Sequence, residues 1–250
     1  MDKTCDRLSW NLIKVVINSM GFSQHWINLI MECVSTTCFQ VLINGALLGA
    51  ITPTRGLRQG DPLSPYLFIL CQNVLSHLFF NAQAQKNLHG IKINRRNPLL
   101  NHFFFANDCF IFFMTNIHSC RHFKNVLKEF YLLSRLKINY TKSKFFISPN
   151  YNTKKKWWFS GILRVKNTET PSKYLGIELG HMNHKRSFFQ PLLNKIQKRL
   201  AGWKGHHLSQ DERLTLIKST LASIPNYSLS CFKAPDYIYR KINQIVRSFW

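Results

Sequence analysis

The sequence predicts an α+β fold in which antiparallel strand pairs lie against amphipathic helices. Two pairs of hydrophobic runs are joined by two-residue links, Asn44-Gly45 and Asn107-Asp108, which is typical of hairpins. Between and after these hairpins, apolar residues recur at helical spacing. The chain has 250 residues, of which 45% are hydrophobic, so it can bury a sizeable core and is not a disordered protein.

The first elements are two helices and a hairpin. Residues 10–20 carry apolar side chains at helical spacing and precede Gly21, which predicts a helix that ends there. A second short helix is predicted over residues 23–34. Residues 39–43 predict a strand, and Asn44-Gly45 turns the chain into a returning strand.

A shaped loop and a long helix follow. Residues 54–65 contain two glycines and two prolines, which favours a loop over a continuing strand. Ser64 followed by Pro65 predicts the start of a helix, with the serine hydroxyl as its cap. The apolar face of this helix comprises Leu67, Leu70, Cys71, Val74, Leu75 and Leu78.

The second hairpin is predicted from residues 103–106 and 109–114, two hydrophobic runs separated only by Asn107-Asp108. Both link residues tolerate positive φ, so they are expected to form the turn. Residues 118–133 then predict a helix, and residues 137–147 predict a turn followed by a strand.

The C-terminal part is predicted to be mainly helical. Residues 174–179 predict a short strand, and helix is expected from Phe188 onward. Ser209 and Glu212 have the spacing of a capping box. A last amphipathic helix, residues 238–249, is still continuing where the sequence stops, so the chain is expected to be a piece of a longer protein.

The charge balance predicts an anionic partner. Lys and Arg total 34 against 11 Asp and Glu, giving a net charge of +23. Nucleic acid is the first partner to consider and an anionic membrane surface is the second. No apolar run approaches the ~18 residues of a membrane span, and no secretory leader is present, so an intracellular protein without a membrane segment is expected, in the nucleus or the cytoplasm. The seven cysteines contain no C-x-x-C pair, which favours reduced thiols.

An acid at a hairpin tip is weak information by itself, because a plain turn is the more common explanation. Combined with an upstream loop and helix, a basic exterior and an early acidic segment, it is typical of a polymerase palm. In a palm, aspartates from two strands hold two divalent metals ~4 Å apart, which activate the primer hydroxyl.

The segment Arg55-Gly-Leu-Arg-Gln-Gly-Asp-Pro-Leu-Ser-Pro-Tyr-Leu-Phe68 resembles the reverse transcriptase domain of plant-type non-LTR (LINE) retrotransposons. Further similarity lies in the matches Met1–Trp10, Met20–Phe22, His102–Phe113, Lys137–Ser143, Tyr174–Gly176, Gly202–Lys204, Leu216–Ser219 and Phe249-Trp250. The resemblance implies a right-hand polymerase palm, an antiparallel sheet backed by helices. Residues 1–185 would form a fingers and palm fragment, and residues 186–250 a thumb-like helical region truncated at its C-terminus.

The resemblance also implies roles for individual residues. Arg58, Gln59 and Gly60 match the loop that packs against the template base and the incoming nucleotide, where a Cβ at the glycine would intrude. Cys5 falls where an aromatic residue screens the ribose. Lys142 matches a proton donor to pyrophosphate, although a solvated turn lysine is the commoner explanation.

Tyr174, Leu175 and Gly176 resemble the hairpin that grips the primer in this family, and a short buried strand is the equally weighted alternative. The implied partners are an RNA template, a DNA primer and deoxynucleotide triphosphates, with Mg²⁺ as the cofactor. The residues imply nothing about the oligomeric state.

The metal ligands are expected to be incomplete. The family asks for two adjacent aspartates at the hairpin, but this chain has Asn107 before Asp108. The other family aspartate would align immediately before Met1, and Asp2 lies two residues too late, ~6–7 Å along a strand. Asn107 offers one neutral oxygen where Mg²⁺ prefers carboxylates, so metal binding by Asp108 is expected to be impaired and the polymerase inactive.

A non-catalytic basic module that binds nucleic acid is the alternative function. The charge of +23 would make such binding salt-dependent. Trp157, Trp158 and Trp203 lie beside Lys and Arg and could stack on unpaired bases, or could equally belong to the core.

Overall fold

The computed structural model describes residues 4–148, 151, 156–169, 173–178, 185–203 and 208–250. It divides into two compact units, residues 1–169 and 170–250, and each is described by itself. The functional boundary between residues 185 and 186 stays a prediction. Of the helices in the described part of the chain, none combines the length and the apolar character that crossing a membrane requires.

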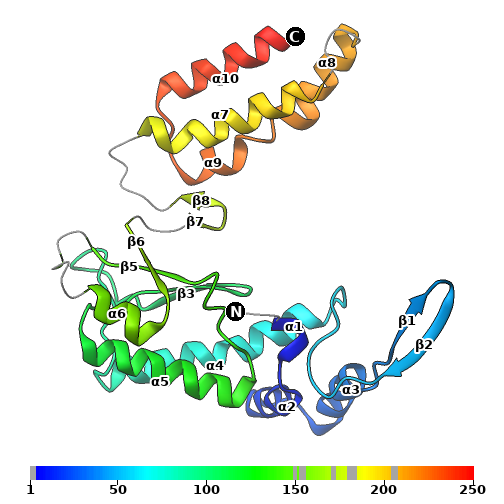
Figure 1. The fold of residues 1–250 in the computed structure, drawn as a ribbon, viewed down its shortest axis with the longest axis vertical. Coiled ribbons are helices and arrows are strands. Elements are labelled where there is room, and N and C mark those ends of the chain that lie inside the picture. Colours follow the sequence, from blue (N-terminus) through cyan, green and yellow to red (C-terminus); the bar gives the residue numbers. More distant parts are fainter. Residues whose placement is uncertain (1–3, 149–150, 152–155, 170–172, 179–184, 204–207) are drawn as a thin grey trace. The chain divides into compact units, whose positions relative to one another are not determined.

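The first unit opens with three helices and a hairpin, as predicted from residue 10 onward (Figure 1). After α1 (Thr4–Arg7), α2 (Trp10–Ser19) ends before Gly21, whose φ is +82°. Ser23 caps α3 (Gln24–Ser35) by accepting a hydrogen bond from the Trp26 N–H. The antiparallel strands β1 (Phe39–Ile43) and β2 (Ala46–Ile51) are joined by Asn44 and Gly45, both with positive φ.

Helix α4 (Ser64–Ala84) is the centre of the first unit, but Ser64 is not its cap. The helix begins at Ser64, and the Ser64 hydroxyl donates to the Asp61 carboxylate at 3.1 Å. Asp61 also accepts from the Leu63 N–H at 3.2 Å, so this acid supports the turn into the helix. The predicted serine cap is therefore wrong, because the helix already includes Ser64 and its N-cap residue is Leu63, which has no capping side-chain hydrogen bond.

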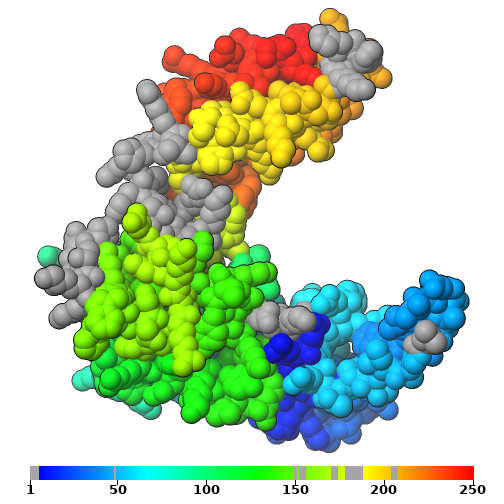
Figure 2. Space-filling view, in the orientation of Figure 1, coloured from blue at the N-terminus to red at the C-terminus, as the bar shows by residue number. Residues whose placement is uncertain are grey.

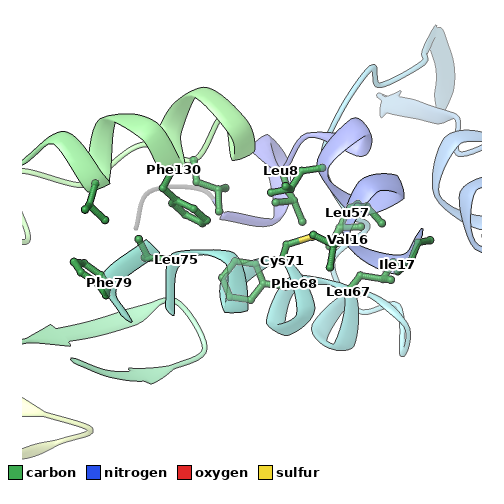
Figure 3. Packing of buried hydrophobic residues seen from close by; sticks show 14 of the residues in the cluster. Leu8, Val16, Ile17, Leu57, Leu67, Phe68, Cys71, Leu75, Phe79 and Phe130 are labelled. Carbon is green, nitrogen blue, oxygen red and sulfur yellow. The ribbon is translucent and has the colours of Figure 1, made fainter. Parts of the chain in front are cut away.

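The core of the first unit forms where α2, α4 and the next long helix, α5 (Ile117–Ser134), meet. Leu75 and Phe79 of α4 are fully buried there, and Phe130 of α5 is 2% exposed (Figure 3). Leu8 lies between α1 and α2, and Leu57 lies in the loop before α4. Both belong to the same cluster (Figure 3). Burying each such side chain contributes ~1.5–3 kcal/mol, so this cluster fixes the segments that flank it.

The second hairpin has a register one residue away from the predicted one. Strands β3 (His102–Phe105) and β4 (Asp108–Ile111) pair Phe105 with Asp108, so the turn residues are Ala106 and Asn107. Asp108 is the first residue of a strand, not part of the turn. Ala106 has the positive φ, +47°.

A strand–helix–strand segment completes the first unit. The predicted strand is β5 (Lys144–Phe146), and it pairs with β6 (Lys166–Thr168) in parallel, because α6 (Lys156–Leu163) crosses between them. Over the described residues the strands form four separate two-stranded sheets. The chain is thus a mixed helix and strand protein, but the single antiparallel sheet that was expected is not what these residues form.

The second unit is mainly helical, as predicted. Its predicted strand is instead a hairpin, β7 (Lys173–Tyr174) and β8 (Ile177–Glu178), because Leu175 and Gly176 both have positive φ and reverse the chain. The helices that follow are α7 (Lys185–Ala201), α8 (Gln210–Leu216), the π-helical turn η4 (Ile217–Leu221), α9 (Asn226–Cys231) and α10 (Asp236–Phe249). They share a core around Phe189, Ile196, Leu221 and Ile238.

The predicted capping box of α8 is confirmed. The Ser209 hydroxyl accepts from the Glu212 N–H, and the Glu212 carboxylate accepts from the Ser209 N–H at 2.7 Å. The hydrogen bonds that Ser209 donates to the Glu212 carboxylate lower the pKa of Glu212.

Candidate active site

The loop at residues 55–60 is held against the N-terminal segment by hydrogen bonds. The Gly56 N–H donates to the Leu8 carbonyl at 2.8 Å, and the Trp10 indole N–H donates to the Gly56 carbonyl at 2.6 Å. The Gln59 side chain donates to the Asp6 carboxylate at 3.2 Å. Two segments that are about fifty residues apart in the sequence thus meet at one place.

Gly60 lies at the open side of this loop. Its φ is +86°, which favours glycine, and a Cβ added there would meet no atom within 4 Å. The protein's own backbone therefore accounts for the glycine, and the expected clash between a Cβ and a bound nucleotide stays a prediction. Arg58 and Gln59 are exposed beside it.

Asn107 and Asp108 are both exposed at the tip of the β3–β4 hairpin. The residue before them, Ala106, has a left-handed backbone with φ +47°. This conformation costs a residue with a Cβ ~1–2 kcal/mol. Backbone strain of this kind persists where surrounding contacts over-determine the conformation.

One such contact joins the hairpin to α4 through Cys109. The Gln72 side chain, 5% exposed, donates to the Cys109 sulfur at 3.7 Å, and the Cys109 thiol donates to the Asn107 carbonyl at 4.0 Å. Burial raises the pKa of the Cys109 thiol to about 11, so it remains a neutral donor at physiological pH.

A second connection from α4 reaches the other strand. The His102 ring hydrogen-bonds the Ser76 hydroxyl at 2.9 Å and the Asn101 side chain on its other nitrogen. Asn101, 2% exposed, donates to Gln83 at 2.8 Å. Burial lowers the pKa of His102, which favours the neutral ring.

These supporting residues were missed by the sequence reasoning. Gln72, Ser76 and Gln83 follow helical spacing along one side of an otherwise apolar helix, and all three contact the hairpin or Asn101 beside it. A polar stripe inside an apolar helical pattern was the signal that could have identified them.

The remaining predicted residues lie elsewhere. Cys5 is in α1, and its side chain is outside the described residues. Lys142 is exposed in the turn after α5, where its N–H donates to the Asn139 side chain at 3.0 Å. Tyr174, Leu175 and Gly176 form the β7–β8 hairpin of the second unit, where the Tyr227 hydroxyl donates to the Leu175 carbonyl at 2.7 Å.

A comparison with known protein families covers both the loop and the hairpin. The sequence model of the family "Reverse transcriptase (RNA-dependent DNA polymerase)" matches residues 3–179. The chain belongs to this family. The reverse transcriptase match therefore includes both the 55–60 loop and the Asn107-Asp108 hairpin, and it continues to the β7–β8 hairpin.

Two curated relatives of this chain come from Arabidopsis thaliana. One, an "Uncharacterized mitochondrial protein", is 60% identical over 67 residues, which are 27% of this chain and 55% of the relative. The other, named "Putative ribonuclease H protein", is 36% identical over 61 residues, 24% of this chain and 10% of the relative. The chain thus spans less than two thirds of each relative.

The side chains at the hairpin tip are the candidates for holding a metal ion. At the hairpin the side chains offer one carboxylate, that of Asp108, and one amide, that of Asn107. Within the described ranges, no three His, Cys, Asp or Glu side chains are grouped so as to hold an ion. Paired Mg²⁺ ions are held by several carboxylate ligands in near-octahedral geometry, so impaired metal binding at this hairpin stays a prediction.

Proposed function

We propose that this reverse transcriptase derives from a plant-type LINE retrotransposon and is defective in DNA synthesis while still binding nucleic acid. Its partners would be an RNA template and a DNA primer, and the deoxynucleotide triphosphates of the parent activity would no longer be used. The fourteen-residue match at Arg55–Phe68 supports the LINE origin. The charge of +23 supports retained binding to a polyanion.

The observation that carries the loss of catalysis is Asn107 at the hairpin tip. Losing one carboxylate that helps to hold a catalytic metal removes roughly 4 kcal/mol of transition-state stabilisation, or about a thousandfold in rate. The hairpin itself accommodates the change, because asparagine suits a tight turn at least as well as aspartate. Loss of catalysis is therefore compatible with an intact fold.

Primer extension on an RNA template tests the proposal. The wild-type chain is expected to give no Mg²⁺-dependent extension above background, whereas robust extension would falsify the claim of inactivity. Asn107→Asp is the matched variant, since it changes one side chain and restores the family's pair of acids. Extension by this variant alone would identify Asn107 as the sole cause of the defect.

The alternative function is a basic nucleic-acid-binding module without any polymerase role. The specific observation in its favour is that the charge excess is spread along the chain and not confined to the 55–60 loop. A template–primer duplex should then compete no better than an unrelated strand for binding. Preferential binding of the template–primer junction would favour the polymerase-derived function instead.

A further inference from the structure

Two tryptophans of α6 are exposed, although the helix is anchored by its next residue. Trp157 is 67% exposed and Trp158 is 47% exposed, while Phe159 is 3% exposed and packs in a small cluster that includes Cys120. The two indole rings lie 5.2 Å apart between centroids, with their planes tilted by 54°. Tryptophan side chains are highly buried on average, so an exposed pair in mutual contact suggests a surface that meets a partner.

The chain around this pair is basic throughout. Residues 130–168 contain nine Lys and Arg residues and no Asp or Glu. Arg164 follows the end of α6 directly, about 9 Å from Trp158 along the helix axis at ~1.5 Å per residue. Figure 2 shows the segment 156–168, coloured yellow-green, at the surface of the first unit. An anionic partner would be attracted to it.

A pair of lysines beside the helix points to the same chemistry. Lys144 of β5 and Lys166 of β6 are in register on neighbouring strands, and both are exposed. Like charges directly opposite each other across two strands destabilise the pairing. A bound anion would relieve this repulsion, so the strand pair favours a ligand with negative charge.

We infer that α6 and the β5–β6 pair bind an unpaired nucleic-acid strand. Its bases would stack on Trp157 and Trp158, and its phosphates would pair with Lys144, Arg164 and Lys166. The inference rests on the nucleic-acid binding included in the proposed function, and it assigns that binding a site outside the Asn107-Asp108 hairpin. The bases of a duplex are already stacked on one another, so only an unpaired strand offers free base faces.

Stacking and phosphate pairing do not contact the sugar, so RNA and DNA strands should bind alike. A membrane surface is the less favoured occupant, because an interfacial helix needs a wide apolar face, and the large apolar residue next to the pair, Phe159, is buried instead.

Trp26 of α3 provides a matched comparison. It is 58% exposed, so it is as accessible as Trp157 and Trp158. However, residues 15–54 contain no Lys or Arg. An exposed indole therefore occurs in both helices. What distinguishes α6 is that its exposed indoles lie in a basic stretch of the sequence.

The test measures binding of the full chain to labelled strands by fluorescence anisotropy. The probes are poly-uridine RNA and poly-thymidine DNA of equal length, a blunt DNA duplex, and vesicles of phosphatidylserine and phosphatidylcholine. Each stacked base contributes about 5- to 150-fold to affinity. Trp157→Ala/Trp158→Ala is therefore expected to weaken binding of both single strands by about tenfold or more and to leave duplex binding within about twofold.

Control variants separate stacking from charge. Trp157→Phe/Trp158→Phe should retain most of the affinity, because phenylalanine can still stack, and Trp26→Ala should change nothing. Lys144→Gln/Lys166→Gln should reduce the slope of log affinity against log salt by about 1.4, at ~0.7 per phosphate contact. The tryptophan variants should leave that slope unchanged.

Each contrary result has a distinct meaning. If the wild-type chain binds no nucleic acid, the proposed function and this inference both fail. If it binds strands but the alanine variant binds them equally well, only this inference fails. Binding to anionic vesicles and not to strands would make the patch a membrane contact, and a preference of more than about tenfold for one sugar would also overturn the inference.

Discussion

At Ala106 the local conformational preference and the observed backbone conformation disagree. It has a φ of +47°, although the neighbouring Asn107 is the residue type that tolerates this region better. The pairing of Phe105 with Asp108, and the contacts of Cys109 with α4, hold the turn in this register. The strained residue lies immediately before Asn107, the position at which the resemblance predicts a metal-binding aspartate.

Ala106→Gly is expected to raise the free energy of unfolding by roughly 0.5–1 kcal/mol. Removing the Cβ relieves the left-handed conformation, and the greater freedom of glycine in the unfolded chain offsets only part of this gain. Ala84→Gly, at an exposed helical position of α4, should instead lower stability by about 0.5–1 kcal/mol. Urea unfolding of the two variants measures both signs, and a loss of stability in Ala106→Gly would contradict the strained turn.

Buried thiols are expected to make the fold sensitive to alkali. Burial raises the pKa of Cys71 to about 12 and that of Cys120 to about 11, from an ordinary value of 9.0. Because the folded-state values are higher than those of the unfolded chain, their stabilising contribution is complete below pH 9 and is lost as the pH rises toward 11 or 12. Urea midpoints across this range should fall.

The variant Cys71→Ala should show a shallower fall with pH than the wild-type chain, whatever its stability at neutral pH. Cys33→Ala removes an exposed thiol and should leave the pH slope unchanged. Equal slopes in all three proteins would show that Cys71 does not remain protonated in the fold.

At the scale of elements, side-chain caps decide where the helices begin. The Ser209–Glu212 box follows the predicted pattern, whereas α4 is supported by Asp61 and not by Ser64. Spacing alone could not distinguish Asp61 from Ser64 as the supporting residue of α4, since both precede the same apolar face. The hairpin β3–β4 is a similar case, because its one-residue shift places Asp108 in the strand.

Asn116→Ala is expected to destabilise the first unit by ~1 kcal/mol. The Asn116 side chain accepts from the Ser119 N–H at 2.6 Å and caps α5, whose Phe130 belongs to the main core. Ser23→Ala removes a longer capping hydrogen bond, 3.5 Å, at the exposed start of α3, and should lower stability by less. Hydrogen exchange of the α5 amides measures the effect, and equal losses in the two variants would contradict this ranking.

At the scale of the whole molecule, two separate hydrophobic clusters stabilise two units that differ in content. The first unit contains the matched loop and hairpin, and the second is a helical assembly around Ile196 and Ile238. The chain as a whole carries an excess of positive charge, with 34 basic against 11 acidic residues. Self-repulsion of this size is relieved by a polyanion, which is why binding is the property most worth measuring on the full chain.

Binding of a single strand is expected to weaken linearly in log affinity as log salt rises, because each phosphate contact releases counterions. Affinity that is independent of salt would contradict a phosphate-based interaction.

The sequence by itself determined most of the helices, though not α1 or α6, the presence of the two early hairpins, the capping box, the basic character and the family. These features depend on neighbours within a few residues or on composition, so local pattern was sufficient. Only the tertiary structure decided the exact strand register at Asp108, the parallel β5–β6 pair, the polar stripe of Gln72, Ser76 and Gln83 and the exposure of Trp157 and Trp158. These features arise from contacts between distant segments, and the free energy of such contacts does not follow from the local sequence.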